Sequence, residues 1–404
     1  MKSFIKSIPQ VMGRFNKIGV LNIIRQKGSI SRAELSRVTQ LKKPSISIIV
    51  NNLIQEGFIK ETGIGADNNV LGRKPIMLEL NPDKGYVIGL EIGFQGLIGL
   101  LVDLRNNILH RITRPAMEGV SQSELILAME TMISELIVRS GHGTDKILGI
   151  GIGISGRVDY QRGLVRFSNV FQGENLPLKE RIEKDTGITV FLDSNDNVGA
   201  LAEKWLGKGQ HVQDMFYLSK RRSLGSAIFV NGNLYRGLKN YAGELTFLVE
   251  PAEGINTWPR QAYGAYLSLS ALAVADLEKG ENSWIRESIG GDFSKVTDEL
   301  VFEAARQNDP LALRLVRWYG KHFGVLLAHV ADLLSPELMI LGGDFFLGGD
   351  LLLDTVRDAF RRNASQGINE DVRVELSALG TDAIALGGTA LVMENIFTTK
   401  ERAG

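Results

Sequence analysis

Short polar side chains recur at helical spacing between residues 43 and 55, directly after a pair of lysines. The side chains that can face outward from this segment are Lys42, Lys43, Ser45, Ser47, Asn51 and Asn52. Hydroxyl and amide groups of this length can form hydrogen bonds with base edges in the major groove of DNA. Lysine ammonium groups can contact the phosphates beside them. The chemistry that this segment predicts is recognition of double-stranded DNA.

A second basic group lies in the loop 62–75, which is rich in glycine and asparagine and ends in Gly72-Arg73-Lys74-Pro75. An arginine on such a loop suits the minor groove, because narrow A·T-rich DNA concentrates negative potential there. We therefore add Arg73 and Lys74 to the predicted DNA contacts. Two other interpretations stay open: the arginine could be merely solvated, and small three-helix units also serve as dimerisation modules.

Three helices are expected to position the DNA-reading side chains. Apolar residues at helical spacing predict a first helix over 14–26. A Ser-x-x-Glu capping box predicts a second, short helix over 32–38. Pro44 is tolerated in a first helical turn, so the third helix should run over 43–55.

Two alternating segments, 58–61 and 76–80, predict strands that flank the basic loop. Helix, helix, turn, helix and hairpin form, in this order, a winged helix-turn-helix, and its third helix enters the major groove. The charge agrees, because residues 1–80 hold 13 Lys and Arg but only 5 Asp and Glu, whereas the remaining residues hold 33 and 41. A basic end on an acidic body indicates a polyanionic partner for that end.

The composition excludes several kinds of chemistry. The chain of 404 residues has no cysteine, which excludes disulfides, thiol catalysis, iron–sulfur clusters and cysteine-ligated zinc. Its five histidines are scattered, so no metal site is assigned. The most apolar stretch, 87–104, contains Glu91, Gln95 and Asp103, which predicts strands and a turn and no membrane span. With no targeting segment either, we expect a cytoplasmic protein without cofactor or metal.

The rest of the chain predicts two α/β units of similar design. Each begins with a β-meander and continues into helices, and the meanders lie about 130 residues apart, which indicates a duplication at domain scale. Asn231-Gly232 is a strong hairpin turn in the second meander. The expected strands are 86–90, 97–103, 108–113, 147–154, 214–219, 226–230, 233–235 and 340–343, and the expected helices are 121–139, 297–305, 310–334, 351–361 and 387–394.

Several motifs occur along the chain in a fixed order. They are Gly72-Arg73-Lys74-Pro75, GIGISGRVD at 151–159, DSNDNVGALAE at 193–203, LYRG at 234–237, AGE at 242–244 and LGGT at 386–389. Each motif is modest alone, and their shared order is specific. With the order of the elements, they resemble the ROK family (repressors, open reading frames and kinases), in particular its transcriptional repressors. The similarity covers about residues 15–392.

The resemblance implies an α/β fold, with an N-terminal winged helix-turn-helix followed by a two-lobed, actin-like body related to sugar kinases. We expect the winged helix-turn-helix over 1–80 and a linker over 81–84. The first lobe should comprise 85–195 plus 385–404, and the second lobe 196–384. A ligand is expected in the cleft between the lobes.

The family's kinases bind ATP phosphates with two glycine-rich turns, and both turns differ here. In the first meander, residues 91–95 match the kinase turn Asp-x-Gly-Gly-Thr, and Phe94 replaces a glycine that approaches phosphate. In the second meander, residues 221–225 match the phosphate loop, with its early glycines lost and Arg221 in their place. The arginines of this turn could still hold an anion or could face solvent, and we favour the second interpretation. Backbone amides cradle phosphate only where the chain approaches closely, so the resemblance implies no kinase activity and no catalytic residue.

The sugar side of the cleft is better preserved. The residues that the resemblance assigns to ligand binding are Gly156, Asn195, Asp196 and Glu244. In the kinases the aspartate is the general base for a sugar hydroxyl, whereas in a non-kinase it can only accept hydrogen bonds. Phe247 replaces the family's zinc-binding histidine, and the segment 251–268 lacks its cysteines, so no zinc is expected. The altered contact set predicts a disaccharide, a modified sugar or a cyclitol.

These observations predict a DNA-binding transcriptional repressor of carbohydrate-utilisation genes, controlled by a sugar or polyol between the lobes. It should act as a homodimer or higher homo-oligomer on a palindromic operator, because one recognition helix reads few bases. Two alternatives stay open. The chain could be a ROK sugar kinase with a DNA-binding extension, or a ligand-independent DNA-binding regulator. In the latter the pocket would be vestigial, and Asp196 would serve only as a helix-starting residue.

Overall fold

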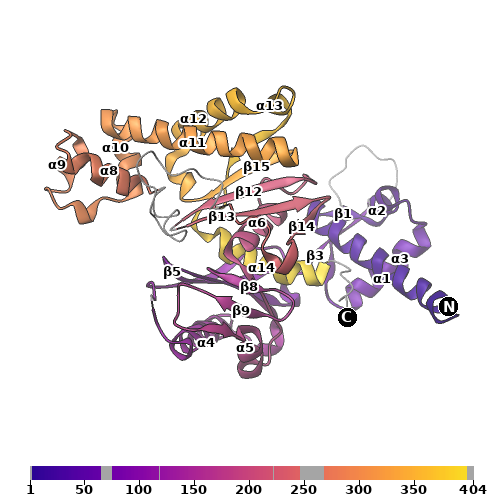
Figure 1. Cartoon of the computed structure of the whole chain (residues 1–404). Coiled ribbons are helices and arrows are strands. Elements are labelled where there is room, and N and C mark those ends of the chain that lie inside the picture. Colours follow the sequence, from indigo (N-terminus) through magenta and orange to yellow (C-terminus); the bar gives the residue numbers. More distant parts are fainter. Residues whose placement is uncertain (1, 65–74, 118, 222, 246–267, 398–404) are drawn as a thin grey trace.

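The computed structural model describes residues 2–64, 75–117, 119–221, 223–245 and 268–397. The chain folds into a winged domain and two α/β lobes, and Figure 1 shows the winged domain at one side of the body, next to the end of helix α14 (Ala383–Phe397). Among the described residues, no helix is long and apolar enough to cross a membrane. Arg73, Lys74, Phe247 and residues 251–267 lie outside the described residues.

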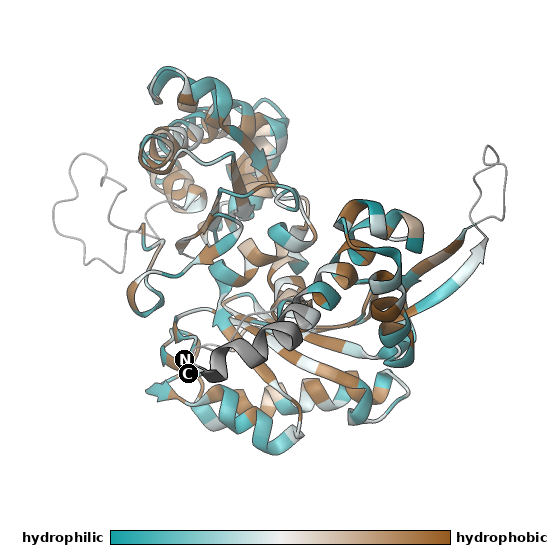
Figure 2. Ribbon diagram, turned by 90° about the vertical axis from the view of Figure 1, so that its right-hand side faces the viewer, coloured by the Kyte–Doolittle hydropathy of each residue, from teal (hydrophilic) through white to brown (hydrophobic). Residues whose placement is uncertain are grey.

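The winged domain has the predicted order of helices and wing strands. Its helices are α1 (Lys2–Lys27), α2 (Arg32–Thr39) and α3 (Lys43–Gln55), and its strands are β1 (Ile30–Ser31), β2 (Ile59–Ile64) and β3 (Ile76–Leu80). The strands pair in the order β1-β3-β2, and Figure 2 shows the β2–β3 hairpin projecting from the body. The predicted bounds of α3 and β3 are confirmed. Ser31 caps α2 by accepting a hydrogen bond from the Glu34 amide at 3.2 Å.

Helix α1 is longer than predicted. The predicted start is residue 14, whereas the helix begins at Lys2. Apolar residues keep a helical spacing before residue 14 as well, so the sequence pattern extends beyond the predicted start. The alternation pattern also cannot detect β1, because a strand of two residues has no period.

The first lobe is a five-stranded sheet covered by helices. β4, β5 and β6 form the predicted antiparallel meander, and β7 and β11 pair in parallel beside β4. Helices α4 (Gln122–Arg139) and α5 (Leu178–Thr186) pack on its outer face. The sheet order is β11-β7-β4-β5-β6, with β4 (Tyr86–Gly93), β5 (Gly96–Asp103), β6 (Ile108–Arg114), β7 (Ile147–Ile154) and β11 (Val190–Ser194). A small separate sheet contains β8 (Arg157–Asp159), β9 (Leu164–Phe167) and β10 (Glu174–Leu176).

The second lobe repeats this strand order, which confirms the predicted duplication. Its sheet has the order β14-β13-β12-β15-β16, so an antiparallel meander again lies beside two parallel strands. The strands are β12 (Met215–Lys220), β13 (Leu224–Val230), β14 (Asn233–Tyr235), β15 (Leu338–Gly343) and β16 (Arg373–Leu376). Apolar residues of its outer face form one cluster with residues of α8 (Leu269–Glu278), α9 (Trp284–Ser288), α10 (Asp298–Arg306), α11 (Pro310–Leu334) and α12 (Gly349–Asn363), and the short α13 (Ile368–Asp371) packs on α12.

Two helices lie between the sheets. Helices α6 (Asn195–Trp205) and α14 (Ala383–Phe397) pack on each other, and α14 also packs on β4 and β7. The backbones approach closely, because a Cβ atom added at Gly151 of β7 would lie 1.7 Å from the carbonyl oxygen of Gly388. A helix from the far end of the sequence therefore completes the inner layer of the first sheet.

The winged domain shares a core with the body. Buried residues of α1 and α14 belong to one apolar cluster. Asn22 of α1 donates a hydrogen bond to the Phe397 carbonyl at 2.5 Å. The Arg25 guanidinium lies 4.3 Å from the centre of the Trp205 ring, at the end of α6. Between the winged domain and β4, residues 82–84 form a 3₁₀ turn, η1 (Pro82–Lys84).

Candidate DNA interface and ligand cavity

Helix α3 presents a polar face to solvent. Its buried side comprises Ile46, Val50 and Leu53, and its exposed residues include Lys43, Ser45, Asn51 and Asn52, with Lys42 just before the helix. Ser47 is half-buried, and its hydroxyl donates to the Lys43 carbonyl at 3.0 Å, which leaves only its lone pairs for another partner. The structure thus brings the described part of the predicted DNA-contacting set to one end and one face of a single helix.

Neighbouring side chains hold Asn51 in one orientation. Arg32 donates from Nη2 to Oδ1 of Asn51 at 3.1 Å and from Nη1 to Glu61 at 2.5 Å. A guanidinium can only donate, so the amide oxygen of Asn51 is the atom that faces Arg32. The amide nitrogen keeps its hydrogens for acceptors outside the protein. This arrangement favours base edges that accept, such as N7 and O6 of guanine or O4 of thymine.

The start of α3 violates the usual preferences of a helix N-terminus. Lys42 is the N-cap residue and makes no side-chain capping hydrogen bond, and Lys43 follows it. A serine or aspartate would cap this end better, and the helix dipole disfavours cations there. Positions that violate local preferences are often functional. Two cations at the start of a groove-facing helix suit contacts with phosphate.

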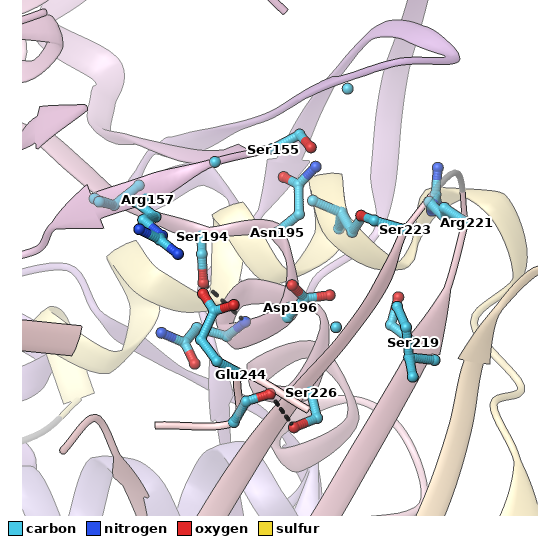
Figure 3. A pocket seen from close by; sticks show the side chains of 18 of the residues that line it. Ser155, Arg157, Ser194, Asn195, Asp196, Ser219, Arg221, Ser223, Ser226 and Glu244 are labelled. Atoms are coloured by element: carbon cyan, nitrogen blue, oxygen red, sulfur yellow. Dashed lines mark hydrogen bonds between the residues drawn. The ribbon is translucent and has the colours of Figure 1, made fainter. Parts of the chain in front are cut away.

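A cavity of about 220 Å³ lies between the two lobes. The four residues predicted to bind a ligand, Gly156, Asn195, Asp196 and Glu244, all line it. Figure 3 shows Asn195 and Asp196 at the start of α6 and Glu244 on the neighbouring segment after β14. Gly156 has φ +145°, and a Cβ atom there would lie 2.3 Å from the Phe167 carbonyl oxygen, so the turn after β7 requires glycine.

Asn195 and Asp196 occupy the first turn of α6 without capping it. Ser194 is the N-cap residue and accepts a hydrogen bond from the Asn197 amide at 3.4 Å. Asn195 donates from Nδ2 to the Ile92 carbonyl at 3.2 Å. Because another residue caps the helix, a purely helix-starting role does not explain why Asp196 lines the cavity.

The carboxylate of Asp196 is closely enclosed. Burial raises the pKa of Asp196 to about 7, and the nearby charge of Glu244 raises this pKa while Arg221 lowers it. A Cβ atom added at Gly225 of β13 would lie 2.1 Å from this carboxylate. Gly225 is the one glycine that the altered second phosphate turn retains. Contact with Asp196 is a reason for its retention that involves no phosphate.

The two altered phosphate turns meet each other across the cleft. Arg221 donates from Nη1 to Glu91 Oε1 at 2.7 Å and to Gln95 Oε1 at 3.0 Å. Gln95 in turn donates to Asp344 Oδ1 at 3.4 Å. The expectation that Arg221 faces solvent is therefore wrong: only 16% of its side chain is exposed, because the buried Glu91 attracts it. Burial raises the pKa of Glu91 to about 7, although the charge of Arg221 lowers it.

Three buried polar atoms of the cavity have no hydrogen-bond partner among the described residues. They are Glu91 Oε2, Asn195 Oδ1 and Arg221 Nε. Two of these atoms accept and one donates. Buried polar atoms are rarely left unpaired, so the cavity suits a molecule that offers both donors and acceptors, such as a polyol. In the part of the chain that the structure describes, no group of three or more His, Asp or Glu residues could hold a metal ion.

Sequence reasoning missed a buried polar cluster next to the cavity. Asp193 is fully buried and accepts hydrogen bonds from Arg236, Asn197 and Asn240, each at 2.9 Å. These residues come from the end of β11, the start of α6 and the segment after β14, so the cluster joins the two lobes. Asp193 and Arg236 both occur in motifs that resemble the family's, but separate motifs do not reveal that their residues meet.

Comparison with known families agrees with the order of the domains. Residues 87–395 match the ROK family, and residues 16–60 match a winged helix-turn-helix DNA-binding family. The chain belongs to the ROK family. The ROK match spans both lobes and the cavity between them.

Repressors and a kinase resemble this chain. The xylose repressor of Caldicellulosiruptor bescii is 25% identical over 97% of this chain and 99% of its own length. The structure of a ROK family transcriptional regulator, a homologue of the E. coli MLC protein, has a TM-score of 0.81 at 24% identity and covers 96% of this chain and 97% of its own. A ROK glucokinase from Streptomyces griseus, solved with glucose and AMPPNP, has a TM-score of 0.66 at 26% identity and covers 77% of this chain and 100% of its own.

Proposed function

We propose that this ROK protein is a transcriptional repressor of carbohydrate-utilisation genes, that a sugar or polyol in the cavity controls its affinity for DNA, and that it has no kinase activity. The observation that carries the proposal is the cavity itself. Its hydroxyl-binding groups are kept, while an arginine spans the two turns that match phosphate-binding turns. The similarity to a xylose repressor over nearly the full length supports the assignment to carbohydrate genes.

The proposed ligand donates hydroxyl hydrogens to Asn195 Oδ1, Asp196 and Glu244, and Gly156 lets the turn after β7 approach it. Each hydrogen bond to a charged acceptor contributes on the order of 1.5–3 kcal/mol. Loss of one such bond therefore weakens binding by at least about tenfold, since 1.4 kcal/mol is a factor of ten.

The proposed absence of kinase activity rests on Arg221. Its guanidinium pairs with Glu91, the residue that matches the acid of the kinase turn, at 2.7 Å. Phe94 adds a bulky side chain where the kinase turn has glycine. ATP would have to displace this buried contact, and leaving a buried charged group without its partner is costly.

Helix α6 is the proposed route from the cavity to DNA. Its first turn carries Asn195 and Asp196, and its last residue, Trp205, stacks under Arg25 of the winged domain. A ligand shifts DNA affinity only by binding one arrangement of the lobes more tightly than another. A displacement of α6 on ligand binding would reach α1 directly through Trp205.

A screen for stabilising ligands tests the cavity assignment. A ligand at 100 times its dissociation constant adds about 2.7 kcal/mol to the free energy of unfolding. We expect stabilisation by a member of a panel of xylose, other monosaccharides, disaccharides and cyclitols. In calorimetry with that sugar, Asp196→Asn should bind at least about tenfold more weakly. Asp145→Asn, at an exposed carboxylate outside the cavity, is the control. Undiminished binding to Asp196→Asn would remove this residue from the site.

The kinase alternative requires its own assay. Purified protein, ATP, Mg²⁺ and the same sugar panel should give no phosphorylated sugar above the level of a protein-free control. Turnover that Asp196→Asn abolishes would establish a kinase with a DNA-binding extension. Binding to DNA with no response to any sugar would instead favour a ligand-independent regulator.

The proposed operator is a palindrome bound by a homodimer. Two recognition helices related by a two-fold axis read half-sites about one helical turn of DNA apart, or a multiple of that distance. Sedimentation of the complex with a selected duplex measures the number of chains bound. A single chain per duplex would contradict this part of the proposal.

A further inference from the structure

Ile48 is an apolar residue on the polar face of α3. Its side chain is 63% exposed, although α3 has a separate apolar face that is buried in the winged domain. It lies one helical turn from Ser45 on one side and from Asn51 on the other, and both of these residues are exposed. Ile48 therefore belongs to the same outward row as the predicted base-reading groups.

The DNA major groove offers one apolar group to such a side chain, the C5 methyl group of thymine. A β-branched side chain in a helix is restricted almost to one χ1 rotamer, so Ile48 would lose little freedom on contact. The exposed Lys42 and Lys43 at the start of the same helix complement the charge of a polyanion. This charge favours DNA over an apolar protein surface as the partner of this face.

We propose that Ile48 is a specificity-determining residue that contacts the C5 methyl group of a thymine in the operator. The inference rests on the proposed DNA-binding function and names one base that the protein selects. Cytosine at the same position lacks this methyl group and offers an amino group instead, so Ile48 discriminates against it. Asn51, whose oxygen faces Arg32, donates to an acceptor on a neighbouring base.

The test uses the full-length protein and a duplex that this protein enriches from a random library of double-stranded DNA. Each thymine of the duplex is replaced in turn by uracil, which keeps the Watson–Crick edge and lacks only the methyl group. At one thymine per half-site we expect a loss of affinity of about fourfold, the effect of withdrawing one buried methyl group. At that position, Ile48→Ala should bind the thymine and uracil duplexes equally.

Two further variants complete the test. Val38→Ala is the matched control, because Val38 is an apolar residue of α2, outside the recognition helix, that is 47% exposed; it should keep the full preference for thymine. Ile48→Val, which is one methylene shorter, should keep part of the preference for thymine. It also preserves the β-branched side chain, so it replaces Ile48→Ala in the test if the alanine variant does not fold. The inference would be overturned if no thymine-to-uracil replacement lowered the affinity, or if the loss were the same in the wild type and the Ile48 variants. Either result would leave the proposed function standing. Failure to enrich any duplex would overturn the proposed function and the inference with it.

Discussion

At the scale of single residues, Glu91 makes the stability of the protein depend on pH. The ordinary pKa of a glutamate, 4.5, rises to about 7 in the folded chain because Glu91 is buried. Between these values the folded state holds a proton that the unfolded state has lost, so the free energy of unfolding falls as pH rises through this window. Between pH 4.5 and pH 7, the free energy of unfolding should therefore fall by roughly 1–3 kcal/mol less in Glu91→Gln than in the wild type.

Urea denaturation of the wild type and Glu91→Gln at several pH values measures the effect. The quantity to compare is the change of unfolding free energy with pH, because the substitution also alters the hydrogen-bond partner of Arg221, and that effect is separate from the titration of this carboxyl. Glu278→Gln, at an exposed glutamate at the end of α8, should keep the wild-type pH dependence. Parallel curves for the wild type and Glu91→Gln would show that this carboxyl does not titrate in the window.

The sequence could indicate which residues line the cavity but not how they pair. Asn195, Asp196 and Glu244 lie in short motifs with a family resemblance, so their shared cavity was predictable. Glu91 and Arg221 are 130 residues apart and belong to turns that differ from the family pattern. Their pairing depends on how the two lobes face each other, which no local pattern encodes. Ile48 was overlooked because apolar residues in helices are usually assigned to the core.

At the scale of elements, helix α3 begins with a lysine where a capping residue would make the protein more stable. Lys42→Ser should raise the free energy of unfolding by about 1 kcal/mol, because the backbone at Lys42 already has N-cap geometry and the new hydroxyl can accept from the Ser45 amide. The same change should lower the slope of log affinity for DNA against log salt by about one, since one phosphate contact is lost.

Chemical denaturation and a salt titration of DNA binding measure the two effects separately. Lys321→Ala, at an exposed lysine on α11 far along the chain from the winged domain, should leave the salt slope unchanged. If Lys42→Ser were more stable and kept the wild-type slope, Lys42 would not contact phosphate, and its presence at the N-cap would have no functional explanation.

The elements that could be predicted are those with a long period or a strong end signal. Strand β7 and helix α11 have the predicted bounds, because continuous apolar residues or a helix-starting proline define them. The short β1 was missed because a strand of two residues has no period, and the predicted start of α1 was twelve residues too late. The two antiparallel meanders were predictable from their alternating segments, whereas the strands β11 and β16 and the position of α14 between the sheets were not predicted.

At the scale of the whole molecule, the contact between Arg25 and Trp205 should carry the effect of the sugar to DNA. Burial lowers the pKa of Arg25 to about 10, so its guanidinium is still charged at neutral pH. Arg25→Ala removes this contact without touching the cavity or α3. When one ligand controls the binding of another, it typically changes the affinity for the other by about 5–150-fold. In Arg25→Ala we expect the ratio of DNA affinities with and without sugar to fall towards one. The affinity for the sugar itself should stay within about twofold of the wild-type value.

Fluorescence anisotropy of a labelled duplex, with and without saturating sugar, gives this ratio. The control is Arg139→Ala, at an exposed arginine at the end of α4 in the first lobe, which should keep the wild-type ratio. If Arg25→Ala kept the wild-type ratio as well, the signal would have to reach the winged domain by another contact.

The shared core also predicts how the molecule unfolds. Residues of the winged domain and of the first lobe belong to one apolar cluster, so they should melt in a single cooperative transition. Ser31→Ala removes the cap of α2 and should lower the stability of that whole transition by about 1 kcal/mol. Differential scanning calorimetry measures this. A separate early peak that shifts alone in Ser31→Ala would show that the winged domain folds independently.

The position of α14 has a consequence for how the protein is made. The ribosome releases the winged helix-turn-helix first and α14 last, yet α1 packs on α14, and Gly151 of the first sheet lies directly against Gly388 of α14. A nascent chain therefore exposes its winged helix-turn-helix well before α14, on which α1 packs, has been synthesised. A truncated messenger RNA that ends before codon 383 still encodes every predicted DNA contact. The chain made from it lacks α14, so the inner layer of the first sheet is incomplete. We therefore expect full DNA-binding competence only of chains that include α14, so that unfinished copies would not occupy the operator.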